Sequence, residues 1–166
     1  MTDWVIPSPQ IKRIQQSSVA TCWLAACQML FQWKNRSVLE VENLLRSSSD
    51  ERVDFDCWCD SGIGTDDLVP LAKALGLNWG AGGTVPAWLL AQTVDQCGPI
   101  MVVGEWSASS HVIVLAEIED GESSDAAAIR IANPWFGCDE REQRNVFWLN
   151  QGLGQWRDIN GQYIHW

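Results

Sequence analysis

The hydrophobic period of this chain changes at Gly98, and this change restricts the fold more than any other feature of the sequence. Before Gly98 the apolar residues recur at spacings of three and four, which is typical of helices that bury one face. After Gly98 short β-branched and aromatic runs alternate with Gly, Ser and Asp clusters, which is typical of strands and turns. Helices followed by strands predict an α+β domain whose N-terminal helical half packs on a C-terminal antiparallel sheet.

Four helices are predicted in the first part of the chain, over residues 22–33, 38–46, 66–76 and 86–97. Ser37 and Glu40 have the spacing of a capping box at the start of the second helix. Pro86 suits the first turn of the fourth helix, and Gly98 suits its end. The charged and aperiodic segment 50–64 is predicted to be a long loop.

Four strands are predicted in the second part, over residues 99–106, 111–119, 127–135 and 144–150. The segment 119–125, EDGESSD, has the composition of a hairpin turn between the second strand and the third. Neither a repeat nor a linker divides the chain, and its length suits one hydrophobic core. Residues 1–166 are therefore predicted to form a single domain.

Charge and hydropathy exclude several classes of partner. The 21 acidic and 11 basic side chains give a formal net charge of −10, which repels nucleic acid and anionic lipid. This acidity either serves solubility or receives a basic substrate. No apolar run approaches the roughly 20 residues of a membrane span, and the first residues lack the apolar stretch of a secretory signal. We therefore expect a soluble protein in the cytoplasm of the cell that makes it.

The six cysteines are interpreted as free thiols, because a chain this long and apolar does not need disulfides. Cys57 and Cys59 form a Cys-x-Cys pair in the segment DCWCD. A structural zinc site takes a second pair of Cys or His, and none lies nearby in the sequence. A loop with incidental cysteines is the favoured interpretation, and no metal is expected.

Cys22 is the candidate nucleophile, since it opens the helix predicted over 22–33. A thiol reacts as the thiolate, and the free N–H groups at a helix N-terminus are expected to lower its pKa. Cys27 lies one turn later and is expected in the core. His111 begins a predicted strand after the small, polar turn SASS, whereas His165 lies next to the end of the sequence. His111 is therefore the preferred general base.

Two further polar residues complete a catalytic site around this pair. Asn133 lies near the end of the next predicted strand, and antiparallel pairing brings that end beside His111, where an amide orients the imidazole. Gln16, six residues before Cys22, is placed to donate its side-chain N–H to an oxyanion hole together with the Cys22 N–H. Gln15 is the neighbouring alternative.

Eleven tryptophans are a high number for this chain, and most of them are expected to fill the core or to line a groove. Trp58, Trp79, Trp88 and Trp106 lie near predicted loops. Trp106 and Trp88 are the candidates for substrate binding.

These residues resemble the motifs of papain-like cysteine proteases. Members of that family carry a Gln, five residues and then Cys-Trp, as in the stretch QSSVATCW that begins at Gln16. They also carry an Asn-x-Trp-x-Gly-like segment, and this chain has NPWFG from Asn133. The resemblance implies a papain-like fold with the nucleophile at the start of the central helix. It further implies that Trp135 shields the hydrogen bond between Asn133 and His111 from water.

The short separations between these motifs are closer to compact bacterial members, such as plant-pathogen avirulence proteases and bacteriocin-leader peptidases, than to papain and cathepsins. Those relatives usually carry Asp at the position of Asn133. The likeness spans residues 16–137. It implies a cysteine endopeptidase that acts on a protein or peptide substrate without a metal or cofactor, with the roles given above for Cys22, His111, Asn133 and Gln16.

The lack of a secretory signal and of a visible inhibitory propeptide predicts that activity is controlled by other means. We expect a bacterial effector or toxin that a specialised secretion machine delivers without a signal peptide, with an immunity protein or a secretion chaperone as partner. Two alternatives stay open. The same triad serves glutamine deamidation, transglutamination or peptidoglycan amide cleavage, and the same scaffold serves as a non-catalytic binding module.

Overall fold

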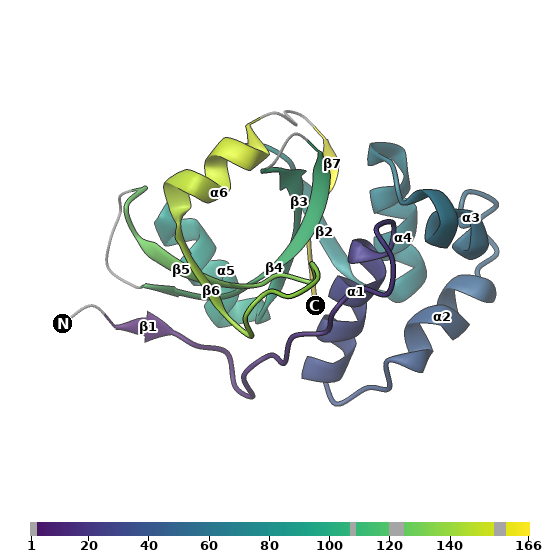
Figure 1. Ribbon diagram of the computed structural model, residues 1–166, viewed down its shortest axis with the longest axis horizontal. Coiled ribbons are helices and arrows are strands. Elements are labelled where there is room, and N and C mark those ends of the chain that lie inside the picture. The colour runs from purple at the N-terminus through teal and green to yellow at the C-terminus, as the bar shows by residue number, and fades with distance from the viewer. Residues whose placement is uncertain (1–2, 107–108, 120–124, 155–158) are drawn as a thin grey trace.

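The computed structural model describes residues 3–106, 109–119, 125–154 and 159–166. In these residues one curved sheet lies beside a group of helices (Figure 1). All pairs of neighbouring strands are antiparallel, and the α+β prediction is confirmed. None of the described helices has the length and apolarity that crossing a membrane requires.

The order of the elements follows the predicted change of period, with additional elements in both parts of the chain. The helical half contains α1 (Cys22–Trp33), α2 (Leu39–Arg46), α3 (Phe55–Ser61), a 3-10 turn (Thr65–Asp67) and α4 (Leu68–Leu75). The strands are β1 (Trp4–Val5), β2 (Asn78–Ala81), β3 (Ile100–Glu105), β4 (Ser110–Glu119), β5 (Ala128–Ala132), β6 (Glu142–Asn145) and β7 (Asn160–His165). Two more helices, α5 (Ala87–Cys97) and α6 (Val146–Leu153), pack on the sheet.

The strand order places the predicted catalytic residues at one end of the sheet. The order is β2-β7-β3-β4-β5-β6, and the short β1 pairs with the far end of β4. His111 lies near the start of β4, opposite Gly104 of β3. β5 runs antiparallel to β4 and ends one residue before Asn133. The predicted pairing of these two strands is confirmed, and it brings His111 and Asn133 to the same end.

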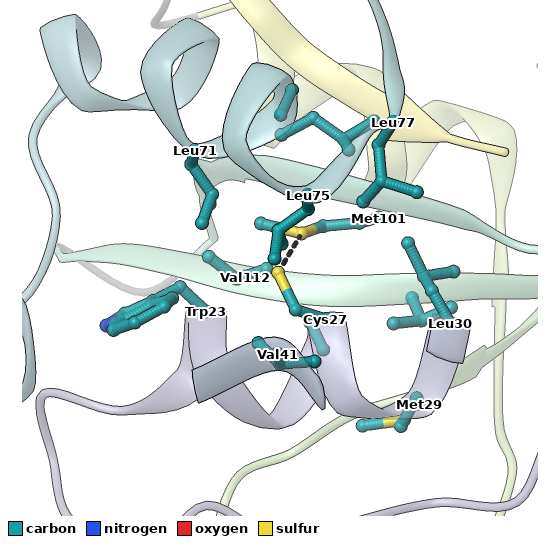
Figure 2. Packing of buried hydrophobic residues seen from close by; sticks show 14 of the residues in the cluster. Trp23, Cys27, Met29, Leu30, Val41, Leu71, Leu75, Leu77, Met101 and Val112 are labelled. Carbon is teal, nitrogen blue, oxygen red and sulfur yellow. Dashed lines mark hydrogen bonds between the residues drawn. The ribbon is translucent and has the colours of Figure 1, made fainter. Parts of the chain in front are cut away.

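Alternate residues of the central strands pack into two separate cores. Met101 and Val112 lie in the core that α1 and α4 cover, together with Cys27 (Figure 2). The Cys27 Sγ is 3.7 Å from the Met101 Sδ, so the prediction of a core position for Cys27 is confirmed. Val102 and Ile113 lie in the opposite core, under α5 and α6. This period of two is that of a sheet buried on both faces. The helix α5 therefore covers the face opposite to α1 and α4 and does not belong to the helical half.

The segment 50–64 is not a loop throughout, because it contains α3. The Asp54 carboxylate accepts a hydrogen bond from the N–H three residues later at 3.0 Å and caps the first turn. Phe55 and Trp58 are buried, and their rings meet Trp23 edge to face at centroid distances of 6.1 and 5.8 Å. Contacts with a distant helix therefore stabilise a short helix that its own periodicity does not reveal.

The strand predicted over 144–150 is wrong, because β6 ends at Asn145 and α6 follows directly. The Asn145 side chain accepts a hydrogen bond from the Trp148 N–H at 2.9 Å and caps this helix. Leu149 and Leu153 are buried at helical spacing. The β-branched and aromatic run indicates a strand by composition, but the cap and the buried face favour a helix.

Two predicted helix starts are nearly correct. Glu40 accepts a hydrogen bond from the Ser37 N–H at 3.2 Å, as in a capping box, but the Ser37 hydroxyl accepts from the Leu39 N–H instead. Pro86 is the N-cap of α5 rather than a residue of its first turn. Gly98 follows α5 with a φ of 82°, which only glycine adopts readily.

Three strands are not predicted from the sequence, namely β1, β2 and β7. β7 carries His165 and lies between β2 and β3. Trp166 follows β7 in the sequence and donates its indole N–H to the Leu30 carbonyl at 2.9 Å, which anchors this segment on α1. The hairpin turn predicted over 119–125 falls mostly on residues outside the described part of the chain.

Candidate active site

Cys22 is the first residue of α1, with Thr21 as its N-cap. Because α1 packs against β4, the N-terminus of the helix lies beside the start of the strand. Cys22 is half-buried and lines a cavity of about 290 Å³ together with His111 and Val112. The other lining residues are Val19, Ala20, Trp23, Ser61, Gly62, Ile63, Val103 and Ser110. The predicted nucleophile and the predicted base therefore share one cavity.

The protonation of this pair differs from the sequence prediction. Burial raises the pKa of the Cys22 thiol, although backbone N–H groups of Val112, Trp23 and Cys22 itself favour the thiolate. Burial also lowers the pKa of His111, although the hydrogen bond that the ring donates to Asn133 and the charge of Glu142 oppose this shift. The helix N-terminus acts as predicted, but desolvation outweighs it. The predicted lowering of the Cys22 pKa is therefore wrong, because burial outweighs the backbone N–H groups.

The tautomer of His111 follows from the contacts of Asn133. The His111 Nε2 lies 2.8 Å from the Asn133 Oδ1, and the Trp135 N–H donates to the same Oδ1 at 3.0 Å. A backbone N–H only donates, so this atom of Asn133 is the oxygen and not the amide nitrogen. The His111 Nε2 must then carry the ring proton. Its Nδ1 is left as the basic nitrogen, which suits a general base.

Trp135 packs on the imidazole. Its ring meets the His111 ring edge to face, with centroids 5.7 Å apart and an interplanar angle of 89°. The indole covers the imidazole on one side and remains 44% exposed on the other. The role of Trp135 as a shield of the His111–Asn133 hydrogen bond stays a prediction.

Gln16 lies beside the loop that carries Asn133. Its backbone N–H donates to the Pro134 carbonyl at 2.8 Å, and its side chain is 2% exposed. The side-chain amide donates to the Ser18 carbonyl at 2.7 Å, and Gln16 does not line the cavity that Cys22 and His111 share. The oxyanion role of Gln16 stays a prediction. Gln15 is the weaker alternative, because its side chain accepts from the Gly137 N–H on the far part of the loop.

Glu142 is a residue of this site that the sequence does not reveal. Its Oε2 lies 3.5 Å from the Asn133 Nδ2 and 3.2 Å from the Arg144 guanidinium, and its side chain is largely buried. Its charge raises the pKa of His111. The strand predicted over 144–150 begins too late to include Glu142, so no pattern connects it with Asn133.

A second cavity of about 670 Å³ shares Val19, Ser110 and His111 with the first. Trp106 lies in its wall, stacked on Trp148 at a centroid distance of 5.3 Å. A Cβ on Gly152 would lie 2.1 Å from the Trp106 Nε1, so only glycine makes room for this ring. The other lining residues are Ser109, Ile113, Asn133, Trp135, Glu142 and Arg144.

Not all of the predicted groove residues come together here. Trp88 lies on α5 and is 58% exposed, and it lines neither cavity of the site. Trp58 is buried in the core, and Trp79 lies on β2. His165 lies on β7, where its Nδ1 contacts the Trp166 carbonyl at 2.7 Å. His111 is thus the histidine that the fold brings to Cys22.

The remaining cysteines are free thiols, and Cys57 is exposed on α3. Among the residues that the structure describes, no cluster of three or more His, Cys, Asp or Glu side chains is arranged to hold a metal ion. Cys57 and Cys59 therefore have no set of further ligands in the described part of the chain.

A comparison with known protein families matches the part of the chain that contains all four candidate catalytic residues. The model of the family described as papain-like cysteine protease AvrRpt2 matches residues 7–151, which include Gln16, Cys22, His111 and Asn133. No curated protein is similar enough to match the chain. The match agrees with the fold, in which a thiol at the start of a central helix faces a histidine on an antiparallel sheet. The chain therefore belongs to the family of papain-like cysteine protease AvrRpt2 and is a cysteine peptidase.

Proposed function

We propose that Cys22, His111 and Asn133 form the catalytic triad of an endopeptidase. The observation that carries this proposal is the 2.8 Å hydrogen bond between the His111 Nε2 and the Asn133 Oδ1. It fixes one side of the ring and leaves Nδ1 as the basic nitrogen, and His111 and Cys22 line the same cavity. A nucleophile, a base and an orienting group are the three parts that acyl transfer by a thiol needs.

In the first half of the reaction the Cys22 sulfur attacks the carbonyl carbon of the scissile amide. Because burial raises the pKa of the Cys22 thiol, its proton passes to the His111 Nδ1 as the S–C bond forms in this proposal. The Cys22 backbone N–H and the Gln16 amide stabilise the oxyanion. The imidazolium then gives its proton to the amide nitrogen, the C–N bond breaks, and the amine product leaves a thioester on Cys22.

In the second half water hydrolyses the thioester. The His111 Nδ1 takes a proton from the attacking water, the C–S bond breaks, and the proton returns to the Cys22 sulfur as the acid product leaves. Asn133 keeps the Nε2–H tautomer through both halves. Trp106 contacts the substrate in this proposal, which its position in the wall of the larger cavity beside His111 supports.

We further propose that the protein is a bacterial effector or toxin that cleaves a protein in the target cell. In this proposal it is made in the cytoplasm, is delivered by a specialised secretion machine, and is held inactive by an immunity protein or a secretion chaperone. The support is the family description and the net charge of −10, which favours a protein partner over nucleic acid or anionic lipid.

New protein N-termini in a treated cytosol test this proposal directly. Wild type and Cys22→Ala are expressed separately in a bacterial and in a eukaryotic cytosol, and the N-termini are identified by mass spectrometry. We expect cleavage products with wild type only, because peptide hydrolysis requires the Cys22 sulfur. Identical sets of N-termini would contradict an endopeptidase. Gln-to-Glu conversion without new N-termini would instead identify a deamidase.

The pH dependence of kcat/KM tests whether the free enzyme holds a neutral Cys22 thiol beside a neutral His111 imidazole. We expect kcat/KM to fall on the acid side only below pH 6.5, because burial lowers the pKa of His111 and the general base must be unprotonated. Since Glu142 raises that pKa, Glu142→Gln should lower it further and move the limb to lower pH. Little decline is expected up to about pH 9, because burial raises the Cys22 pKa.

Initial rates on a peptide substrate provide this profile, with Glu51→Gln as the control that removes an exposed carboxylate elsewhere. Glu51→Gln should leave the limb in place. A bell-shaped profile whose acid limb rises at about pH 4 would identify a thiolate–imidazolium pair and contradict a neutral thiol beside a neutral imidazole.

A further inference from the structure

The loop that carries Asn133 is held by the N-terminal segment. β5 ends one residue earlier, so strand pairing does not satisfy the next three carbonyls. The Asn133 carbonyl accepts from the Arg13 Nε at 2.5 Å, and the Trp135 carbonyl accepts from the Nη2 of the same guanidinium. The Pro134 carbonyl between them accepts from the Gln16 N–H at 2.8 Å. Three consecutive carbonyls are thus bound by two residues.

Arg13 is itself fixed at its backbone. Its N–H donates to the Glu140 Oε1 at 2.6 Å, and two residues earlier the Ile11 carbonyl accepts from the Arg141 guanidinium. The segment around Arg13 is therefore anchored to the part of the chain that follows the Asn133 loop. An arginine anchored in this way loses less freedom when it binds the loop carbonyls than a free surface side chain does.

The guanidinium bridges two carbonyls that are two residues apart, and this fixes the curvature of the loop. The curvature of the loop determines the directions in which the Asn133 and Trp135 side chains point. The Asn133 Oδ1 holds the His111 Nε2, while the Trp135 N–H holds that Oδ1 and the Trp135 ring packs on His111. The planar fork of arginine suits this geometry, whereas the ammonium of lysine acts as a single point charge.

We propose that Arg13 is a positioning residue for the His111–Asn133 pair, acting through the backbone of residues 133–135. It touches neither the substrate nor Cys22 in this proposal, and its effect on rate rests on the proposed function. Loss of the bridge lets Asn133 and Trp135 shift together. A shift of about 1 Å at the base is enough to reduce a rate about 100-fold.

Kinetics of Arg13→Ala and Arg13→Lys provide the first test, with Arg52→Ala as a matched control. Arg52 is exposed and pairs with Asp50, away from the site. We expect kcat to fall about 30- to 100-fold in Arg13→Ala with KM changed less than about threefold, and a smaller fall in Arg13→Lys. Millimolar guanidinium should restore part of the kcat of Arg13→Ala, and urea at the same concentration should not.

The second test does not depend on catalysis. The described residues hold both histidines of the chain, so the hydrogen-bonded Nε2–H of His111 is assigned in the NMR spectrum with a His165→Gln variant. We expect this signal to persist in wild type and Arg52→Ala and to broaden or vanish in Arg13→Ala. If wild type cleaves nothing but the signal behaves in this way, the proposed function fails and the role of Arg13 stands.

The opposite results overturn the role of Arg13. One is a wild-type kcat in Arg13→Ala. Another is a loss of kcat with an unchanged His111 signal and no rescue by guanidinium. If Arg13→Ala does not fold, Arg13→Lys decides between the outcomes, because it keeps the charge and one of the two hydrogen bonds. A full wild-type rate and signal in Arg13→Lys would then contradict the bridge.

Discussion

Replacement of Cys22 by alanine is expected to lower kcat/KM by at least about 10⁴-fold, because substrate binding and oxyanion stabilisation alone remain. The substitution removes one sulfur atom from a half-buried side chain, so the free energy of unfolding should change by less than about 1 kcal/mol. Hydrolysis of a peptide substrate and urea unfolding of the same sample measure both quantities.

Cys57→Ala is the matched control for this loss. Cys57 is exposed on α3, and its thiol lies 3.6 Å from the Ser61 hydroxyl. The control should keep the full wild-type rate. More than a tenth of the wild-type rate in Cys22→Ala, or an equal loss in Cys57→Ala, would show that Cys22 is not the nucleophile.

Trp23→Ala is expected to reduce the free energy of unfolding by about 3–5 kcal/mol, the usual cost of removing a large aromatic side chain from a core. Trp23 is fully buried, and its ring joins α1 to Phe55 and Trp58 of α3. Its indole N–H donates to the Trp58 carbonyl at 3.2 Å, so the truncation also leaves that carbonyl without this donor. Urea unfolding followed by circular dichroism measures the loss.

Trp88→Ala is the comparison for this experiment, because it removes the same atoms from a side chain that is 58% exposed on α5. Its cost should stay below about 1 kcal/mol. Equal costs for the two variants would contradict the central position of Trp23 between α1 and α3.

The parts of the site that the sequence predicts are those that rest on local pattern. The helix from Cys22 has a clear stripe of buried residues, and the pairing of β4 with β5 brings His111 beside Asn133. The Gln-to-Cys spacing is local as well. Each of these features is encoded within one element or between two neighbouring strands.

The parts that the sequence does not predict depend on contacts between distant residues. Arg13 and Asn133 are 120 residues apart, and no period or cap connects them. The short helix α3 forms because Phe55 packs on Trp23, which its own composition does not indicate. The pKa of Cys22 rises because the fold buries it, and burial is a property of the packed structure and not of the motif.

The position of β7 inside the sheet has a consequence for the synthesis of the protein. β7 (Asn160–His165) lies between β2 and β3, although it comes after all the other strands in the sequence. A nascent chain that has emerged from the ribosome as far as residue 150 already contains Cys22, His111 and Asn133 but lacks this interior strand. The sheet is complete only when the segment 160–165 has inserted between two strands made much earlier. Chains that stop before this segment therefore carry the proposed catalytic side chains without a finished sheet to support them, and the pairing of β7 with β2 and β3 is a long-range step of folding.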